Sequence, residues 1–596
     1  MIRITSVLLA AAGVFALATP ESADAPQNPA SLYNAEAPKT ILDLQQFRRT
    51  SSIHVRSGLR GVREREGVAT LVNLNPTINT WYLLSVVWRN AGAQDSAWHL
   101  ENPKPHEAQI LLDEKYPSGL VIAEAGNRYS CDLFGPGSLP NALEQGRNSQ
   151  LIYYPLCGGR LYLRNPAKGR RTALEAATEF LRNQVWGGER VIVLFHHLMA
   201  DRYRETGELR NRNEAASGPI AADRPVPALI DPAYADRLIV PDNLGIALEA
   251  QGTERSGVTP GAWYPKAGNA GIYVSVMQPN FMAQSILRGY KSLVSILDGV
   301  EVSSLCYLIA FDLDRFELGF ALGTAYPEVG WSDRAIEQMR GSRLPGPDGI
   351  GSIAPLISTG LISPENGRRT VATFTGGFKR THGAFRYGDL ALRNHGSHYG
   401  FIENGIVFSK LQPGLATIFA LNDGSIDMKT WMERDDTLLP GIRYARQNGV
   451  PLVTFADATQ STVPGGLVAR WGPGNWSGSE DEKLRTIRSG VALQKSQGKR
   501  FLIYAVFSDA TPSAMARIFQ AYQCNYAMLL DMNALEHTYL AVYSRSGSDM
   551  SVEHLLKGMS QLDQSVSGQI VPRFLGYPDN RDFFYVMRRS VKENKP

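Results

Sequence analysis

The pattern of apolar and polar positions changes about halfway along the chain. Between residues 51 and 165, short runs rich in Val, Leu, Tyr and Trp alternate with turn residues, as in 68–88 and 158–165. Such runs are typical of short β-strands. We therefore expect a β-rich N-terminal module over residues 26–201. The polar stretch 202–267 is predicted to be a linker or an irregular connection.

The second half, residues 268–596, has clearer signals. Strands are predicted at 271–278 and 305–313 from continuous apolar runs. Asn404-Gly405 and Asp423-Gly424 each lie between apolar residues, a pattern that predicts a hairpin with a tight turn.

A strand, a helix and another strand are then predicted in succession. The run 501–507 predicts a buried strand. Thr511 and Pro512 predict the start of a helix, because Thr is a good N-cap and Pro is tolerated at the first helical position. The run 526–531 predicts a strand that ends at Asp531. Together the two halves predict an α+β protein, in which the β-rich module precedes a mixed α/β domain over 268–596.

The first residues predict export. Arg3 precedes an apolar run at 7–18, which is too short to span a bilayer comfortably, and small residues suited to cleavage follow. We expect residues 1–25 to be a signal peptide and the mature protein to be periplasmic or secreted. No later segment reaches the length of a membrane span, so no integral membrane span is expected after removal of the signal.

Charge and cysteine content narrow the function classes. The 61 basic and 57 acidic residues give a net charge of +4, which is no footprint for nucleic acid. Export permits disulfides, and Cys131 and Cys157 lie in one turn-rich neighbourhood, so we expect them to pair. Cys306 and Cys524 are expected either to pair or to remain buried thiols.

Motifs for metals and cofactors are missing from the sequence. There is no CxxC pair, Walker loop, GxSxG elbow, HExxH or Rossmann glycine fingerprint. These findings argue against a structural zinc site, an NTPase, an α/β-hydrolase, a zincin and a nicotinamide enzyme. We expect neither a metal nor a cofactor.

Four motifs follow one another in the second half. They are the Gly-Gly turn in 374–379, a glycine-bounded segment at 387–400, the strand RTIRSGVA at 485–492, and the strand that ends at Asp531. Their order resembles the phosphodiester glycosidase domain, the family of the lysosomal uncovering enzyme. Members of that family remove N-acetylglucosamine from a phosphodiester on mannose. The resemblance covers about 300 residues, none of them in the N-terminal half.

The chain departs from the family pattern at two places. Thr375 stands where the family has Asn, and Met532 to Leu535 stand where the family has a run of Gly and Ser. Gly-rich backbone lets a ligand approach closely. We therefore expect Met532 and Leu535 to fill or reshape the space beside Asp531.

Candidate site residues follow from the chemistry that the resemblance implies. A phosphodiester glycosidase must hold a phosphate, for which Arg is suited, and the family position falls at Arg488 or at Arg485. Asp531 is expected to be the acid/base or orienting carboxylate, or else a residue that caps a turn. Glu536 and His537 follow it and would do acid/base work, or belong to a local hydrogen-bond network.

Further residues are expected to bind substrate. Gly376 and Gly377 would form a backbone turn suited to an anion, and Lys379 adds positive charge beside them. His398 is expected to assist at the site.

Two functions from different classes remain. The first is an exported hydrolase of glycosyl phosphodiesters or related envelope glycans, with a carbohydrate or phosphoglycan as its ligand. The second is a non-catalytic envelope protein that keeps the fold and binds glycan or serves a structural role.

Overall fold

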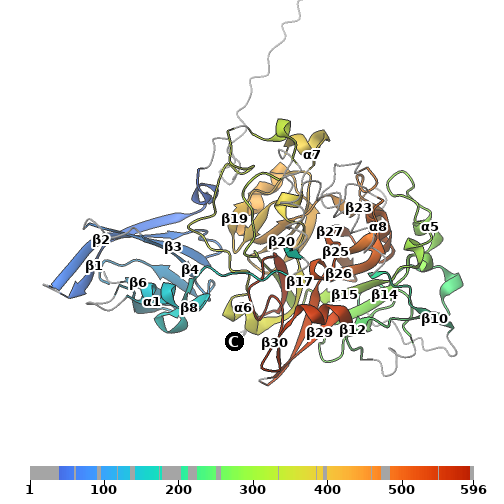
Figure 1. Cartoon of the computed structure of the whole chain (residues 1–596), viewed down its shortest axis with the longest axis horizontal. Coiled ribbons are helices and arrows are strands. Elements are labelled where there is room, and N and C mark those ends of the chain that lie inside the picture. Colours follow the sequence, from blue (N-terminus) through green and yellow to red (C-terminus); the bar gives the residue numbers. More distant parts are fainter. Residues whose placement is uncertain are drawn as a thin grey trace, which may run out of the picture.

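The computed structural model describes most of the chain after residue 38. The described residues are 39–59, 62–89, 96–116, 119–134, 141–172, 175–176, 203–211, 224–249, 257–332, 335–341, 343–383, 385–393, 399–457, 460–470, 483–547 and 549–590. The predicted signal peptide and His398 lie outside them. In Figure 1 the N-terminal module projects from a larger body that holds the second half of the chain.

The described residues between 49 and 164 form a β-rich module. One antiparallel sheet has the order β1-β2-β3-β4-β9-β8, and a second has the order β5-β6-β7. The elements of the module are β1 Arg49–Leu59, β2 Val62–Asn73, β3 Trp81–Trp88, β4 Ser96–Glu101, β5 Ala108–Leu111, β6 Gly119–Glu124, β7 Asn127–Asp132, α1 Ala142–Asn148, β8 Tyr153–Leu156 and β9 Leu161–Arg164.

A disulfide joins Cys131 near the end of β7 to Cys157 just after β8, which confirms the predicted pair. Cys131 belongs to the apolar core between the two sheets of the module. The bond therefore ties the smaller sheet to the larger one at their shared core. Cys306 and Cys524 are free and buried.

The larger body contains three antiparallel sheets. Their orders are β13-β14-β15-β26-β25-β27-β23-β24, β12-β29-β28-β17-β32-β16 and β19-β18-β22-β20-β21. The strands of the first are β13 Tyr264–Pro265, β14 Ile272–Met277, β15 Cys306–Asp312, β23 Pro451–Ala456, β24 Ser461–Pro464, β25 Thr486–Ser496, β26 Lys499–Ala510 and β27 Tyr526–Met532. The strands of the second are β12 Leu244–Gly245, β16 Phe316–Ala321, β17 Thr370–Thr375, β28 Leu540–Ser546, β29 Asp549–Leu556 and β32 Phe583–Arg588. The strands of the third are β18 Phe401–Glu403, β19 Ile406–Ser409, β20 Ala416–Leu421, β21 Ile426–Thr430 and β22 Ile442–Gln447.

Helices and small hairpins complete the body. The helices are α5 Gln284–Leu287, α6 Pro364–Arg369, α7 Gly388–Arg393, α8 Pro512–Ala521 and the short 3-10 turns η10 Leu535–His537 and η11 Lys557–Leu562. The hairpins are β10 Glu208–Asn211 with β11 Arg237–Val240, and β30 Gln564–Val566 with β31 Gln569–Val571. Strands predominate over helices, so the body is α+β at a coarse level.

Several local predictions are confirmed. The turns at Asn404-Gly405 and Asp423-Gly424 connect β18 to β19 and β20 to β21. Helix α8 begins at Pro512, and the Thr511 hydroxyl accepts a hydrogen bond from the Ala514 amide at 3.3 Å. These elements were predictable because their signals are local.

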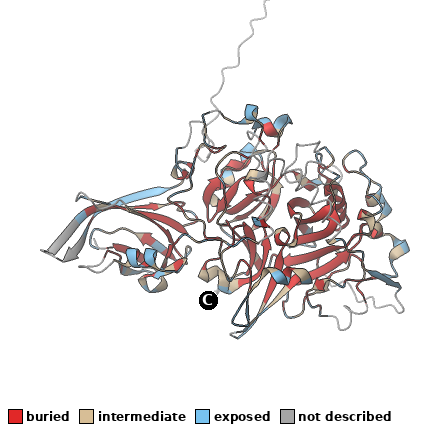
Figure 2. Ribbon diagram, in the orientation of Figure 1, coloured by how far each residue is buried: buried red, intermediate tan, exposed pale blue. Residues whose placement is uncertain are grey.

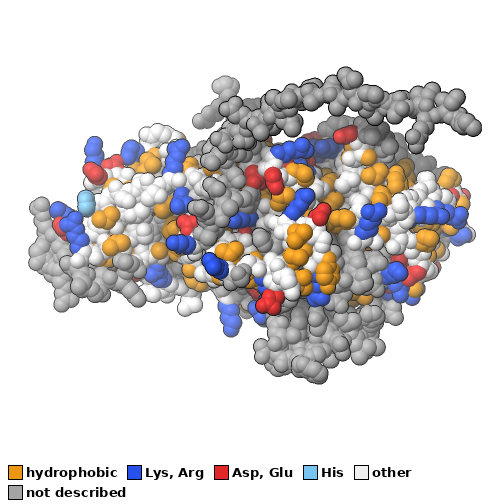
Figure 3. Space-filling view, turned by 90° about the horizontal axis from the view of Figure 1, so that it is seen from above, with side chains coloured by type: hydrophobic (Ala, Val, Ile, Leu, Met, Phe, Trp, Pro, Cys, Tyr) orange, Lys and Arg blue, Asp and Glu red, His pale blue; other side chains and the backbone are white. Residues whose placement is uncertain are grey.

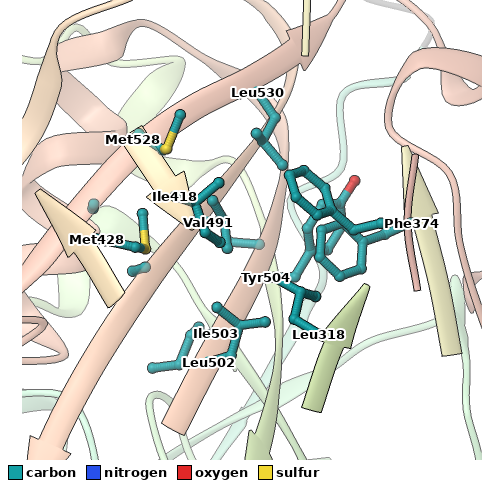
Figure 4. Close-up of a cluster of buried hydrophobic side chains, with 14 of the residues drawn as sticks. Leu318, Phe374, Ile418, Met428, Val491, Leu502, Ile503, Tyr504, Met528 and Leu530 are labelled. Carbon is teal, nitrogen blue, oxygen red and sulfur yellow. The ribbon is translucent and has the colours of Figure 1, made fainter. Parts of the chain in front are cut away.

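The sheets of the body share one hydrophobic core. Figure 4 shows part of it, where Phe374 of β17 and Leu318 of β16 meet Tyr504 of β26. The central strands β25, β26 and β27 are almost entirely buried, and Figure 2 shows the same for most strands of the body. Strands buried on both faces read as continuous apolar runs, which is why these segments could be recognised in the sequence.

The stretch 202–267, assigned to a connection, takes part in the body. Its described residues form β10, β11, β12 and β13, and Ile246 and Trp263 lie in the core of the larger body. Trp263 also packs on Tyr522 with ring centroids 5.3 Å apart. Polar composition alone did not reveal these contacts.

The N-terminal module is fixed to the body by buried polar contacts. Arg164 forms an ion pair with Glu101 at 2.6 Å and donates a hydrogen bond to the carbonyl of Ile357 at 3.0 Å. The Tyr153 hydroxyl lies 2.9 Å from that of Thr359. These contacts place the end of β9, and the chain that follows it, against the larger body.

The described part of the face drawn in Figure 3 has no single dominant charge. Basic and acidic side chains are interspersed on the face drawn in Figure 3. Among the described residues, no helix has both the length and the apolar character needed to cross a bilayer.

Candidate active site

Arg581 is the centre of a buried polar cluster. Its Nη1 donates a hydrogen bond to Asp531 Oδ2 at 2.6 Å, and its Nη2 lies 2.7 Å from His537 Nε2. Nη2 also lies 3.2 Å from Glu175 Oε1. One guanidinium therefore connects Asp531 and His537, which are six residues apart, to Glu175 from the other half of the chain.

Two buried strands position Asp531 and Arg581. Asp531 lies near the end of β27, and Arg581 lies two residues before β32 begins. Both strands are apolar and belong to the shared core. Because the core fixes the backbones of both strands, the Asp531 carboxylate and the Arg581 guanidinium meet at the margin of that core.

The Asp531 carboxyl is poised to exchange a proton near neutral pH. Only 5% of the residue is exposed, and its Oδ1 accepts a hydrogen bond from the Met532 amide at 2.8 Å. Burial raises the pKa of Asp531 to about 6, although the Arg581 charge acts in the opposite direction. A carboxyl with such a pKa can serve as a general base or acid under physiological conditions.

His537 is held as a neutral ring. Burial and the neighbouring Arg581 charge keep the pKa of His537 well below its usual range. Its Nδ1 lies 2.7 Å from the carbonyl oxygen of Met532, which can only accept, so Nδ1 carries the proton. Nε2 then accepts from Arg581. With both nitrogens engaged, the geometry fits a residue that orients Arg581 better than one that shuttles protons.

Glu175 brings the N-terminal half of the chain into the cluster. Its carboxylate lies 3.1 Å from Lys379 Nζ and accepts a hydrogen bond from Asn580 Nδ2 at 3.0 Å, in addition to its contact with Arg581. Burial acts to raise the pKa of Glu175, but the Arg581 and Lys379 charges outweigh it and hold the pKa well below its usual range. Glu175 is therefore an ionised carboxylate inside a cationic cradle.

The chain just before Glu175 is bonded to the chain just before Arg581. The Arg170 amide donates to the carbonyl of Pro578 at 3.0 Å, and the Asn580 amide donates to the carbonyl of Arg170 at 3.1 Å. Gly169 contacts the Thr324 hydroxyl through its amide at 3.1 Å. We call the described residues 169–172 and 175–176 the strap, because they link the module to the cluster.

Glu536 lies at the border of the cluster. Its Oε1 accepts a hydrogen bond from the Thr172 hydroxyl of the strap at 3.0 Å, and its carbonyl accepts from Arg573 Nη1 at 2.6 Å. Arg573 in turn is paired with Asp579 at 2.7 Å. Burial raises the pKa of Glu536. Asp531 and Glu536 are thus two carboxyls whose pKa values burial raises, and the Arg581 charge acts against burial at both.

Gly376 and Gly377 allow close packing beside the cluster. A Cβ atom on Gly376 would come within 2.4 Å of Asp582 Oδ2, and one on Gly377 within 2.6 Å of Asn448 Oδ1. Asp582 is paired with the buried Arg446 at 2.8 Å. The glycines therefore let the end of β17 approach this second buried ion pair.

Several buried polar atoms here have no partner among the described residues. They are the Tyr326 hydroxyl, Asn580 Oδ1, Glu175 Oε2 and Asp582 Oδ1. Burial raises the pKa of Tyr326 well above its usual value, and the nearby Asp582 charge adds to this. Buried groups of this kind are costly unless a ligand or water binds them. Their concentration around Arg581 marks this region as the candidate site.

Arg488 and Arg485, the expected phosphate ligands, lie elsewhere. Arg488 is fully buried and donates to the carbonyls of Ala510 and Leu484, both at 2.7 Å. Arg485 pairs with Asp298 at 3.3 Å. The reason is register: Arg488 lies opposite Met532 in the sheet and shares its face, whereas Asp531 points to the other face.

The two residues expected to fill the space beside Asp531 also point away. Met532 Sδ lies 2.9 Å from Arg488 Nη1, on the opposite face of β27. Leu535 packs near Gly558 in η11, where an added Cβ would meet its Cδ1 at 3.0 Å. The departure from the Gly-rich pattern thus leaves the Asp531 side of the strand unblocked by these two side chains.

Arg581 and Glu175 were missed by the sequence reasoning. The run Asp579-Asn580-Arg581-Asp582 is a dense polar segment just before an apolar strand, and this pattern was a usable signal. Glu175 lies in the other half of the chain, so no local signal connects it to Asp531. Among the described residues, no three His, Cys, Asp or Glu side chains are grouped as a metal site would require.

Comparisons with known proteins give only distant similarities. No family model matches the chain, and no curated protein matches it. A solved structure of the zebrafish N-acetylglucosamine-1-phosphodiester alpha-N-acetylglucosaminidase catalytic domain, auto-inhibited by its pro-peptide, aligns with 10% identity and a TM-score of 0.27 over 61% of this chain and 95% of that one. A hypothetical protein from Synechocystis aligns with 10% identity and a TM-score of 0.23 over 90% of this chain and 99% of that one. Scores this low carry no argument about activity.

Proposed function

We propose that the protein is an exported hydrolase that acts on glycosyl phosphodiesters or related anionic envelope glycans, with the Arg581 cluster as its active centre. The observation that carries the proposal is that one buried guanidinium contacts both Asp531, a carboxyl with a raised pKa, and Glu175. The order of motifs in the second half supports the substrate class. The disulfide between Cys131 and Cys157 fits an exported protein.

The roles follow from charge and protonation. Arg581 and Lys379 would hold the phosphate, since a guanidinium and an ammonium both bind anionic oxygens. Asp531 would take a proton from the attacking water once it is ionised, above a pH of about 6. The water oxygen would bond to the sugar carbon as that carbon loses its bond to the phosphate oxygen, and the leaving phosphate would keep the electron pair. Glu536, also with a raised pKa, would supply the leaving oxygen with a proton.

Two features of the structure determine how a substrate could reach the Arg581 cluster. His537 is partly exposed, whereas Asp531, Glu175 and Arg581 are buried. Glu175 already occupies Arg581 and Lys379 with its carboxylate. A phosphate would therefore either take the place of that carboxylate or bind next to it.

The test is hydrolysis by the purified mature protein. Substrates are UDP-N-acetylglucosamine and a nitrophenyl glycosyl phosphodiester, and the variant is Asp531→Asn. We expect turnover by the wild type and a loss of about 100-fold or more in kcat/KM in the variant. The matched control is Asp436→Asn. Asp436 is also a buried carboxyl, and burial raises its pKa to about 6, but the residue lies outside the cluster.

The outcomes separate the proposal from the alternative. Equal activity in Asp531→Asn and Asp436→Asn would refute Asp531 as the base. No turnover of either substrate by the wild type would favour a non-catalytic envelope protein that binds glycan. The observation that favours this alternative is that the Glu175 carboxylate of the same chain already pairs with Lys379 and Arg581.

A further inference from the structure

A cavity of about 550 Å³ lies at the opposite end of β27 from Asp531. It is lined by the end of α8, the turn into β27, strands β23 and β24, and the chain after α5. Figure 1 shows α5, α8 and β23 together on the side of the body away from the N-terminal module. Asn525 at this cavity is six residues from Asp531, which corresponds to roughly 20 Å along a strand. The cavity is therefore separate from the Arg581 cluster.

Two exposed aromatic rings line the cavity. Tyr290 is 38% exposed and Phe455 is 39% exposed. Aromatic residues with this much exposure are uncommon in the rest of the described chain, where large apolar side chains are mostly buried. Flat apolar rings at the surface of a cavity suit the apolar CH faces of a sugar ring, which stack on them.

Amide side chains supply the polar part of the lining. Gln460, Gln520, Gln523 and Asn525 all face the cavity. An amide carries both donors and an acceptor, as does a sugar hydroxyl, so the two match without any charge. Amides together with aromatic rings are a chemistry suited to a neutral polyol.

Gln520 gives an independent sign of a ligand. The residue is only 5% exposed, and its Nε2 donates to the carbonyl of Thr462 at 3.0 Å. Its Oε1 is buried and has no partner among the described residues. A buried acceptor without a partner is costly, and a donor on a bound molecule would satisfy it.

Backbone strain is concentrated at the same cavity. Tyr290, Gln460 and Gln523 have φ values of 52°, 47° and 55°, in the left-handed region that disfavours side chains other than glycine. All three line the cavity. Strained residues of this kind tend to gather at functional sites, where the surrounding structure holds them in place.

The charge of the cavity favours a neutral ligand over an anion. Lys495 is the one charged residue among its lining residues. The cavity also lies at the C-terminal end of α8, where the partial charge of the helix is negative and repels anions. We propose that this cavity is a binding site for a neutral segment of an oligosaccharide or polysaccharide, distinct from the anion-binding Arg581 cluster. This inference does not depend on the proposed hydrolase activity.

The test is binding of neutral oligosaccharides to the full chain by isothermal titration calorimetry. The probes are chitohexaose, cellohexaose and maltohexaose at up to millimolar concentration. We expect at least one of them to bind, and we expect Phe455→Ala and Tyr290→Ala each to weaken binding by about tenfold, because each removes one stacking ring. Tyr116→Ala is the matched control, since Tyr116 is 37% exposed and lies in the N-terminal module.

Two further variants make the result decisive. Gln520→Met keeps the length of the side chain but removes the Oε1 acceptor, so binding should weaken while the melting temperature shows that the variant is folded. Asp531→Asn should leave binding unchanged. The inference is overturned if none of the three sugars binds, if the double variant Tyr290→Ala/Phe455→Ala binds as the wild type does, or if Asp531→Asn abolishes the binding.

Discussion

Replacing Glu175 by Gln tests how the N-terminal half controls the Arg581 cluster. The Glu175 carboxylate lies 3.1 Å from Lys379 Nζ and 3.2 Å from Arg581 Nη2, and all three side chains are buried. Removing one partner of a buried ion pair costs about 3–5 kcal/mol. Gln keeps an oxygen that accepts from Asn580, so we expect the lower end, about 3 kcal/mol.

Differential scanning fluorimetry at pH 7 measures this cost. In a chain of this size, a loss of about 3 kcal/mol corresponds to a melting temperature lower by about 2–4 °C. Glu208→Gln is the matched control, because Glu208 pairs with Arg210 at 2.9 Å on the surface, where the loss should stay within about 0.5 kcal/mol. The pKa of Glu175 is lowered, so its contribution is complete above pH 4.5 and declines as the pH falls through the folded pKa. The difference between wild type and variant should therefore shrink in strong acid.

Inorganic phosphate supplies the second arm of the experiment. In Glu175→Gln, Arg581 and Lys379 lack one negative partner, so phosphate should bind between them and raise the melting temperature of the variant more than that of the wild type. Binding at 100 times the dissociation constant stabilises by about 2.7 kcal/mol. A variant as stable as Glu208→Gln, or an equal response of variant and wild type to phosphate, would refute the view that Glu175 occupies an anion site.

Three other predictions concern the fold around the site. Replacing Cys131 and Cys157 by Ser should lower the stability of the module by about 3 kcal/mol, as measured by urea unfolding, because the bond closes a loop with a sequence separation of 26; unchanged unfolding would contradict a structural role. Gly377→Ala should cost about 2–3 kcal/mol and reduce turnover, since its Cβ would lie 2.6 Å from Asn448 Oδ1; a fully stable variant would show that the turn relaxes freely. Asp436→Asn should raise the free energy of unfolding at pH 7 but not at pH 4, because burial raises the pKa of Asp436 from 3.8 to about 6 and the wild type loses stability as the pH rises between these two values. Equal effects of the substitution at both pH values would contradict a raised pKa.

Local signals in the sequence were sufficient for much of the fold. Helix α8 starts where Thr511 and Pro512 predict it, and the Asn404-Gly405 turn joins two strands as expected. The pairing of Cys131 with Cys157 was also predictable, because the two residues are close in sequence and lie among turns. In each case the structural cause lies within a few residues, or within one small module.

The partners in the site could not be predicted in the same way. Asp531 was recognised because it ends an apolar strand, but the choice of Arg488 as its partner ignored strand alternation, which places Arg488 on the face of Met532. The actual partner, Arg581, is 50 residues further along the chain. Glu175 reaches the cluster only because the module packs on the body, and a contact over so long a sequence separation leaves no local pattern.

The dependence of hydrolysis on pH tests the central claim most directly. The wild-type protein is assayed on the nitrophenyl glycosyl phosphodiester, and kcat/KM is measured as the pH is lowered. If Asp531 beside Arg581 is the base, the rate falls as the carboxyl takes up a proton, with an apparent pKa of about 6. A rate that stays constant from pH 8 down to about pH 4.5, or a low-pH limb near 6 that persists unchanged in Asp531→Asn, would contradict the account.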